Sequence, residues 1–386
     1  MSFSRHHPLL WSLGNPITRL FALLCVSLLL FGCQPTAEDN SLQRALSNND
    51  IAGFQRALNP RAFTFPQDHA AHSGYKNEWW YFTGNLNTAE GRRFGYQVTF
   101  FRIALSAEIP KRQSAWAADH IWMAHTAVTD IDSGQHWHDE RFSREAVGLA
   151  GITSTPWRVW LDDWQLLANG GKFPWQLDLN TDHFSLALTI SPDKKIVLQG
   201  EQGLSRKSSE PGNASYYYSI TRLATSGTIR IGKESYPVTG ASWLDREWGT
   251  SLLAPDQQGW DWFSLQLHSG EEMMFYQLRK KDGGIDTNSQ GSWISPSSEK
   301  TTIQPEQIDL TPLDWWQAPN GANYPIRWRI KLNAPSGLPA KEWIVQAAIP
   351  QQWMNTSIKY WEGAVIIFDV EGKQELGRGY LEMTGY

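Results

Sequence analysis

An aromatic-rich pattern occurs twice in the chain, and this repeat constrains the fold more than any other feature of the sequence. The first copy is Tyr75–Leu86, and Trp260–Leu267 repeats its pattern about 181 positions later (260 − 79 = 181). In each copy a short polar loop containing a glycine, Gly91 or Gly270, leads into a second aromatic segment. Alternating apolar residues on both sides of a short turn are typical of a β-hairpin. We therefore predict two related all-β halves.

The remainder of the chain also favours an all-β fold. From Phe65 onward, short strand-like segments recur between glycine, proline, asparagine and aspartate, without long helical periodicity. Antiparallel strands at this spacing form barrels or sandwiches, because closure of a sheet removes its exposed edges. Without residues 1–32 the chain has 354 residues (386 − 32), and 41% of the whole chain is apolar. These values predict two domains with sizeable cores.

The amino terminus predicts export and lipidation. Residues 1–19 carry two arginines and no acidic residue, and the apolar run at 20–31 has 12 residues, too few to span a bilayer. The run ends at Cys33 in Leu30–Cys33, which resembles the bacterial lipobox, where such a cysteine is cleaved and acylated. Ordinary secretory cleavage, with Cys33 as a spare thiol, is the alternative. We predict that residues 1–32 are a lipoprotein signal peptide.

Residue 34 bears on the location of the anchored protein. Gln34 follows Cys33, where an aspartate would resemble the Gram-negative signal for inner-membrane retention. This favours a lipid-anchored protein of the bacterial cell envelope, in the outer membrane and facing the periplasm. Residues 33–60 are mostly polar, and we interpret them as a tether; a structural cap on the first domain is the alternative.

Charge and cysteine content exclude other classes. Removal of residues 1–32 takes away two of 34 basic residues and none of the 39 acidic ones, so the net charge is 32 − 39 = −7. This balance argues against nucleic acid as a partner. The only cysteines are Cys25 and Cys33, and Cys25 lies in the signal peptide, so the mature chain cannot form an intramolecular disulfide.

The segment Thr239–Ser251 contains the strongest local combination of functional groups. In a strand, alternation places Trp243, Asp245 and Glu247 on one face and the intervening side chains on the other. Two carboxyls beside a tryptophan can have pKa values pushed apart, which gives a proton donor and an acceptor in one pocket. The alternative is structural, in which either acid pairs with an arginine at a buried barrel end.

Histidines and tryptophans supply the other candidates. His125 lies in an apolar strand, as a catalytic group or as a hydrogen-bonded core residue. His136 and His138 form a His-x-His pattern with no convincing third ligand, and we predict no metal. Some of the 21 tryptophans could line an apolar cavity, although core filling is the alternative. The predicted ligand-binding residues are Glu78, Trp79, Trp80, Tyr81, Trp243, Trp248, Trp260 and Trp262.

Three blocks of the sequence resemble the AttH/CrtC family. They are Lys76–Leu86, Trp243–Ser251, and the carboxy-terminal pair Tyr360–Val365 and Gly377–Tyr386. The resemblance covers nearly all of the mature chain. It implies two consecutive lipocalin-like antiparallel β-barrel domains packed together, which we place at residues 61–235 and 236–386. The family includes carotenoid and kievitone hydratases, fungal pericyclases, and secreted AttH-like proteins that often accompany ABC transporters.

The match to the hydratases is incomplete. They tend to show Tyr-His-Asp-His-Asn before Trp-Gly; here Asp245 matches the aspartate, but Leu244 and Arg246 replace the histidines. The resemblance therefore favours a secreted, membrane-anchored AttH-like protein that binds a hydrophobic or amphipathic small molecule or lipid, with an ABC transporter as a partner. One alternative is a cofactor-free hydratase, isomerase or cyclase acting on an isoprenoid-like substrate, with Asp245, Glu247 and His125 as catalytic residues. Another is an envelope assembly factor without a ligand. No cofactor is predicted.

The anchor can be tested directly. In the Cys33→Ser variant, metabolic labelling with a palmitate analogue should disappear and the product should be soluble or uncleaved, because the acylated thiol is gone. Labelling equal to that of the wild type would disprove the lipobox assignment.

Overall fold

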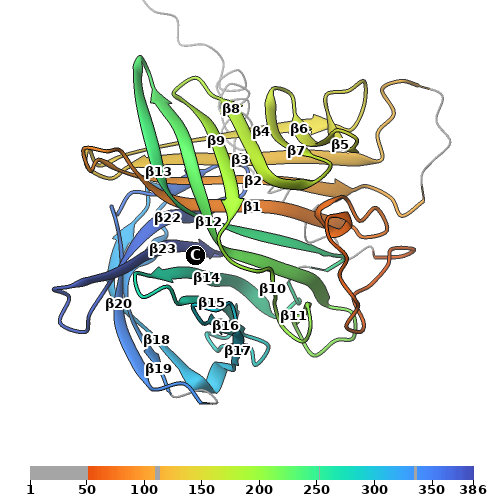
Figure 1. Cartoon of the computed structure of the whole chain (residues 1–386). Coiled ribbons are helices and arrows are strands. Elements are labelled where there is room, and N and C mark those ends of the chain that lie inside the picture. Colours follow the sequence, from red (N-terminus) through yellow and green to blue (C-terminus); the bar gives the residue numbers. More distant parts are fainter. Residues whose placement is uncertain (1–50, 109–113, 252, 334–336) are drawn as a thin grey trace, which may run out of the picture. The chain divides into compact units, whose positions relative to one another are not determined.

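The computed structural model describes residues 51–108, 114–251, 253–333 and 337–386, which form two antiparallel β-sheets (Figure 1). The predicted signal peptide, Cys33 and residues 34–50 of the predicted tether lie outside the described residues. The strands of the first sheet are β1 (Asn77–Asn87), β2 (Arg93–Ala104), β3 (His120–Asp130), β4 (Gln135–Arg144), β5 (Ala150–Ser154), β6 (Trp157–Leu161), β7 (Trp164–Asn169), β8 (Lys172–Asn180), β9 (Phe184–Pro192), β10 (Val197–Leu198), β11 (Leu204–Arg206), β12 (Ala214–Ile231) and β13 (Glu234–Gly249).

The strands of the second sheet follow those of the first in the chain. The only helical elements in the described part are two 3-10 turns, Gln67–His69 and Pro305–Gln307. None of the described helices is long and apolar enough to cross a bilayer. The strands of the second sheet are β14 (Gln257–Leu267), β15 (Glu272–Lys280), β16 (Gln290–Ile294), β17 (Lys300–Ile303), β18 (Ile308–Gln317), β19 (Asn323–Leu332), β20 (Lys341–Ala347), β21 (Trp353–Asn355), β22 (Lys359–Phe368) and β23 (Glu375–Thr384).

The strand order confirms that the two aromatic repeats occupy equivalent places. The first sheet runs β4-β3-β2-β1-β13-β12-β9-β8-β7-β6-β5, and the second runs β17-β16-β15-β14-β23-β22-β20-β19-β18. In both sheets the strand with the aromatic repeat, β1 or β14, lies between the second strand of its sheet and the last one. The prediction of two related all-β halves is therefore confirmed.

The predicted domain boundary at 235/236 needs correction. Strand β13 begins at Glu234, but it pairs with β12 and with β1, so it belongs to the first sheet. The change of sheet falls between Gly249 and Gln257. Gly232 lies in the turn between β12 and β13, where its positive φ of 58° serves the tight turn of a long hairpin.

The described part of the predicted tether packs against the first sheet, as the alternative of a structural cap expects. The side chain of Ala57 is fully buried with Tyr216 and Trp248. The Tyr216 hydroxyl donates a hydrogen bond to the Asn59 carbonyl at 2.8 Å, and the Gln55 amide donates to the Gly74 carbonyl at 2.9 Å. Residues 51–60 are therefore part of the first domain.

Each sheet closes around a core of its own, and a third apolar cluster lies between the sheets. Strand β9 shows the pattern of an outer strand, since Phe184, Leu186 and Leu188 are buried and the residues between them are more exposed. Strand β1 is buried on both faces: Trp80 lies in the first core, whereas Tyr81 lies in the cluster between the sheets. The sheets meet where β1 and β2 contact β22 and β23, as Figure 1 shows.

Candidate functional site

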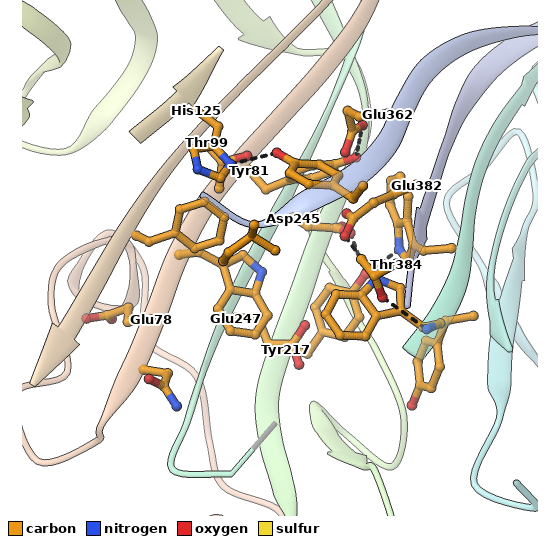
Figure 2. A pocket seen from close by; sticks show the side chains of 18 of the residues that line it. Glu78, Tyr81, Thr99, His125, Tyr217, Asp245, Glu247, Glu362, Glu382 and Thr384 are labelled. Carbon is orange, nitrogen blue, oxygen red and sulfur yellow. Dashed lines mark hydrogen bonds between the residues drawn. The ribbon is translucent and has the colours of Figure 1, made fainter. Parts of the chain in front are cut away.

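A cavity of about 170 Å³ lies between the two sheets. Its walls come from β1, β2, β3, β12 and β13 of the first sheet and from β14, β15, β22 and β23 of the second (Figure 2). The barrel interiors are filled by the two large apolar clusters. An engineered apolar cavity of about 150 Å³ holds benzene, so the pocket has room for a small ring or a narrow chain.

Aromatic side chains form a large part of the pocket wall. Trp79 and Tyr81 project into it from β1, and Trp260 and Trp262 project from β14, the equivalent strand of the second sheet. Residues two apart in a strand share a face, so the repeated aromatic pattern supplies both sides of the pocket. The rings of Tyr81 and Trp262 meet edge to face at 5.1 Å.

Asp245 is a fully enclosed carboxyl in this wall, with no cation bonded to it in the described structure. Its Oδ1 accepts hydrogen bonds from Trp243 Nε1 at 2.7 Å and from Ser219 Oγ at 2.5 Å, and its Oδ2 accepts from the Tyr217 hydroxyl. Burial raises the pKa of Asp245 to about 7, although these three hydrogen bonds act to lower it. Asp245 therefore changes charge near neutral pH.

Two glutamates of the second sheet face Asp245 across the pocket. Glu362 on β22 and Glu382 on β23 are cross-strand partners. The Tyr81 hydroxyl donates to Glu362 at 2.8 Å, and the Trp260 indole donates to Glu382 at 2.9 Å (Figure 2).

Burial raises the pKa of Glu382 to about 7, and burial together with the neighbouring Glu382 raises the pKa of Glu362 well above its usual range. The Oε2 atom of Glu362 is buried and has no hydrogen-bond partner among the described residues. The second sheet therefore contributes carboxyl groups that can carry protons at neutral pH.

Glu247 has a different environment, because a lysine neutralises it. Lys207 Nζ lies 3.0 Å from Glu247 Oε1, and Ser215 also donates to that oxygen. Burial would lower the pKa of Lys207, but the Glu247 carboxylate raises it above the usual value. Pairing of Asp245 or Glu247 with an arginine was the structural alternative, and it is wrong for both acids. Asp245 accepts only from uncharged donors, and the partner of Glu247 is a lysine.

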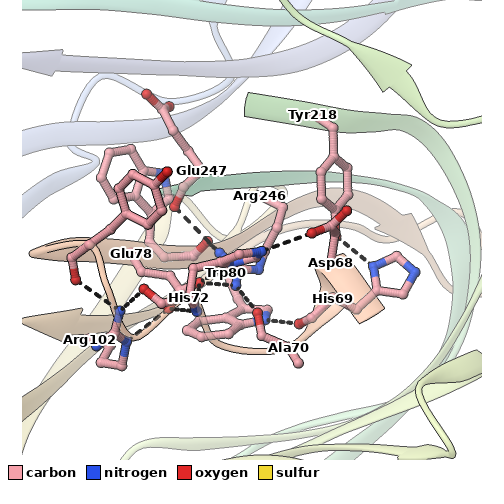
Figure 3. A network of polar contacts seen from close by, with 12 residues as sticks. Asp68, His69, Ala70, His72, Glu78, Trp80, Arg102, Tyr218, Arg246 and Glu247 are labelled. Carbon is pink, nitrogen blue, oxygen red and sulfur yellow. Dashed lines mark hydrogen bonds and ion pairs between the residues drawn. The ribbon is translucent and has the colours of Figure 1, made fainter. Parts of the chain in front are cut away.

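The arginine within the same motif pairs with a different acid, on the opposite face of β13. Arg246 Nη2 contacts Glu78 Oε1, and Arg102 Nε lies 2.8 Å from Glu78 Oε2 (Figure 3). His72 Nδ1 lies 2.7 Å from Oε1 of the same carboxylate. Burial acts to raise the pKa of Glu78, but the charges of Arg246 and Arg102 hold it well below its usual range. The Arg246 guanidinium also lies over the Trp80 ring, 3.8 Å from its centroid.

His125 lies between the two sheets, with both ring nitrogens hydrogen bonded. Its Nδ1 is 2.7 Å from the Tyr360 hydroxyl, and its Nε2 is 2.7 Å from Glu140 Oε1. Only 1% of its side chain is exposed. The expectation that an imidazole in an apolar strand has a specific partner is confirmed, and Tyr360 connects it to the pocket.

The structure brings most of the predicted site residues together. The predicted residues that line the pocket are Glu78, Trp79, Tyr81, His125, Asp245, Glu247, Trp260 and Trp262. Of these, Glu78 directs its carboxylate to Arg246 and Arg102 on the other face of β1. Trp243 lies behind this wall and donates to Asp245. The prediction fails for Trp80 and Trp248, which point to the other face of their strands. Trp80 stacks on Trp122 in the first core. Trp248 stacks on His72, with 3.7 Å between the ring centroids.

Among the pocket residues that were not predicted are four that carry polar groups: Tyr217, Tyr360, Glu362 and Glu382. Three of them lie in the carboxy-terminal blocks that carry the family resemblance, where strand alternation places Tyr360 and Glu362 on one face. That alternation could have marked them as a polar face. The sequence does not show that β22 and β23 pack against β1 and β2.

The His-x-His pattern has a structural explanation. His136 Nδ1 is 2.9 Å from the Thr129 hydroxyl, and His138 Nε2 accepts from the Asn355 amide at 3.1 Å. Burial lowers the pKa of His136 to about 3. Within the described ranges, no group of three or more His, Cys, Asp or Glu side chains is placed to hold a metal ion.

The fold and the site define a protein with two barrel-like domains and an acidic, aromatic pocket between them. The chain belongs to the AttH-like family, whose model matches residues 56–386. The predicted AttH resemblance and the two lipocalin-like antiparallel barrels are thereby confirmed. A comparison with curated protein sequences gives no match.

Solved structures share the fold over most of the chain. A crystal structure of an AttH protein from Nitrosomonas europaea is 34% identical, covers 86% of this chain and 100% of its own, and has a TM-score of 0.75. Kievitone hydratase from Nectria haematococca is 13% identical, with 86% and 98% covered and a TM-score of 0.61. CghA, solved with Sch210972, is 12% identical, with 85% and 94% covered and a TM-score of 0.53. At such low identity the last two support the fold alone.

The Glu78 cluster predicts a large loss of stability for one substitution. Glu78→Gln leaves two buried guanidinium groups without their counter-charge, so the free energy of unfolding should fall by about 3–5 kcal/mol. The matched control is Glu371→Gln, whose partner Lys373 is 76% exposed; it should change the value by less than about 1 kcal/mol. Urea denaturation of both variants measures the difference, and equal shifts would contradict a dominant role for the buried pair.

The raised pKa of Asp245 predicts a pH-dependent stability. Its pKa is about 7 in the folded chain and about 4 when unfolded. The stabilisation from its protonated form is complete below the unfolded pKa and is lost as pH rises through 7. Between pH 5 and 8 the wild type should lose about 2–3 kcal/mol relative to Asp245→Asn, which does not titrate. Denaturation of both proteins across this range tests it, and a constant difference would show that burial does not raise this pKa.

Proposed function

We propose that this AttH-like protein binds a small apolar molecule with a carbon–carbon double bond between its two barrels and transfers protons to and from it, as a hydratase or isomerase does. The observation that carries the proposal is the pair Asp245 and Glu382. They reach one aromatic pocket from different sheets, and each has a pKa of about 7. A general acid or base works best when its pKa lies near the working pH.

Glu382 is the group that we assign as the proton donor. Only one of its oxygens is taken by the Trp260 indole, and the residue is partly exposed. Its proton bonds to one carbon of the double bond, and the other carbon becomes a cation. In hydration, the oxygen of a water molecule bonds to that carbon and one water proton leaves. In isomerisation, a proton leaves from a neighbouring carbon and the double bond forms again at a new position.

Asp245 is suited to stabilise the cation. Three hydrogen-bond donors surround it, and they favour its charged form. A carboxylate held in place beside a developing positive charge lowers the free energy of the transition state without reorganising at the moment of reaction. Trp79, Trp260 and Trp262 line the same pocket, and an indole ring whose face meets the cation attracts it through its π-electrons. Asp245 and Glu382 therefore have separate roles.

Kievitone hydratase shares the fold, and its name states a hydration, so the proposed chemistry has an analogy on this fold. A carrier that binds a hydrophobic or amphipathic ligand without chemistry is the second candidate, and the apolar pocket wall is the observation in its favour. Burial of several carboxyl groups without a neutralising cation lowers the stability of the fold. Binding of an apolar ligand by a carrier would not require these groups. We therefore favour the enzyme.

The cellular setting is part of the proposal on grounds of sequence. Acylation at Cys33 would anchor the protein in the outer membrane, facing the periplasm, where apolar molecules partition from the bilayer. Association with an ABC transporter would place the pocket beside a source of such molecules. The two expectations rest on the lipobox and on the family resemblance.

Incubation with limonene, a ten-carbon isoprenoid diene, in D₂O tests the chemistry. Mass spectrometry should detect alcohol or deuterium in recovered limonene with the wild type, and Glu382→Gln should lower the rate by about 10²–10⁴-fold. The surface variant Glu371→Gln is the control and should keep the wild-type rate. Limonene that is retained by the protein but chemically unchanged would favour the carrier, and an undiminished rate in Glu382→Gln would disprove the assignment of the donor.

A further inference from the structure

Three side chains form a hydrogen-bonded chain that leads from the protein surface to the pocket. Glu140 on β4 is partly exposed, with 18% of its side chain accessible. His125 on β3 is buried between Glu140 and Tyr360, at 2.7 Å from each. Tyr360 on β22 lines the pocket. This series of hydrogen bonds thus crosses from the first sheet to the second and connects solvent with the pocket.

The chemistry of the partners fixes where the protons lie. An ionised carboxylate can only accept hydrogen bonds, so His125 Nε2 carries the hydrogen that Glu140 accepts. Burial acts to raise the pKa of Glu140, but the hydrogen bonds from His125 and Ser357 hold it below its usual value, so the group is ionised at neutral pH. In a neutral imidazole the other nitrogen, Nδ1, then has a lone pair and accepts from the Tyr360 hydroxyl. Burial raises the pKa of Tyr360, which keeps that hydroxyl protonated.

This is the arrangement of a carboxylate, an imidazole and a hydroxyl in which the imidazole can take the hydroxyl proton. In serine hydrolases the hydroxyl then attacks the substrate. A buried tyrosine in an apolar pocket can instead receive a proton as it releases its own. The carboxylate orients the imidazole and stabilises the imidazolium that forms.

We propose that Tyr360 is the proton acceptor of the pocket and that His125 and Glu140 carry the proton from it to the surface. The assignment rests on the proposed proton-transfer function. As the O–H bond of the attacking water or the C–H bond of the cation breaks, its proton bonds to Tyr360 Oη, and the former Tyr360 proton bonds to His125 Nδ1. The Nε2 proton passes to Glu140 and then to solvent. One proton leaves by this route for each proton that Glu382 donates. The transfer of one solvent proton back along the same route to Glu382 then restores both the acid and the Nε2–H tautomer of His125, so the overall balance is zero.

The pocket needs such an acceptor. Glu362 and Glu382 have raised pKa values, so below neutral pH they already hold a proton and cannot accept another. Asp245 is assigned to the cation. Glu247 is occupied by Lys207 and Ser215. The route through His125 and Glu140 also connects the pocket to solvent, so it can release one proton and return another.

A purely structural clamp is the alternative, since Ser357 of the second domain also donates to Glu140. Nuclear magnetic resonance tests a requirement of the relay without any ligand, and the exchange of protons then separates the relay from a clamp. In ¹⁵N-histidine-labelled full-length protein, with the His125 signals assigned by their loss in His125→Asn, the relay requires the tautomer with hydrogen on Nε2. Hydrogen on Nδ1 in the neutral form would overturn the proposal.

Proton exchange measures transport through the relay. The Tyr360 hydroxyl should exchange with solvent faster than the hydroxyl of Tyr96, which is buried against Ser242 in the first core and serves as the internal control. His125→Asn should slow Tyr360 exchange at least tenfold, and Glu140→Gln should slow it while preserving shape. Exchange unchanged in both variants would show that protons reach Tyr360 by another route and would overturn the relay.

Catalysis tests the role of Tyr360 itself. If the wild type converts limonene in D₂O, Tyr360→Phe should lower that rate at least tenfold. Tyr380→Phe, on the neighbouring strand, should leave the rate unchanged, because the Tyr380 hydroxyl has no hydrogen-bond partner in the described structure. An unchanged rate in Tyr360→Phe would refute its role as acceptor. If the wild type leaves limonene unchanged, the proposed function fails with this substrate, and the tautomer and exchange rates still decide on the relay.

Discussion

The buried contact between Arg246 and Glu78 is the constraint on which the rest of the site depends. A guanidinium inside a barrel is stable only beside an opposite charge, and Glu78 supplies that charge while also holding Arg102. The cluster ties β13 to β1 and β2. A shift of β13 by one residue would turn every side chain to the other face, so the same contact keeps Asp245 and Glu247 directed at the second barrel.

The two barrels meet through polar contacts rather than through an apolar seam alone. Tyr81 donates to Glu362, His125 contacts Tyr360, and Lys194 and Arg222 of the first domain both bind Glu272 of the second. At Glu272, the positive charges of Lys194 and Arg222 neutralise the carboxylate, and this contact joins the two domains. Where cations are absent, as at Glu362, the acid must keep its proton. The distribution of lysine and arginine along the junction thus decides which part is structural and which part can exchange protons.

The sequence predicted what depends on local periodicity, and it failed where the packing of distant strands decides. The duplication follows from the aromatic repeat, and the common face of Trp243, Asp245 and Glu247 follows from alternation. Both are confirmed. Trp80 and Trp248 were misplaced because an aromatic run in a strand buried on both sides supplies two different surfaces. Glu382 and Tyr360 were missed because no local pattern reports that β22 and β23 face β1 and β2.

The face of each residue also changes how the incomplete match to the hydratase motif is interpreted. Leu244 and Arg246 stand where the histidines of that motif are expected, and by resemblance the absence of those histidines argues against hydratase chemistry. Both flank Asp245 by one position, so in this chain they point away from the pocket, Leu244 into the first core and Arg246 toward Glu78. Their replacement therefore removes no group from the pocket wall. Other side chains of the pocket that can donate or accept a proton lie outside the motif: His125, Tyr360, Glu362 and Glu382.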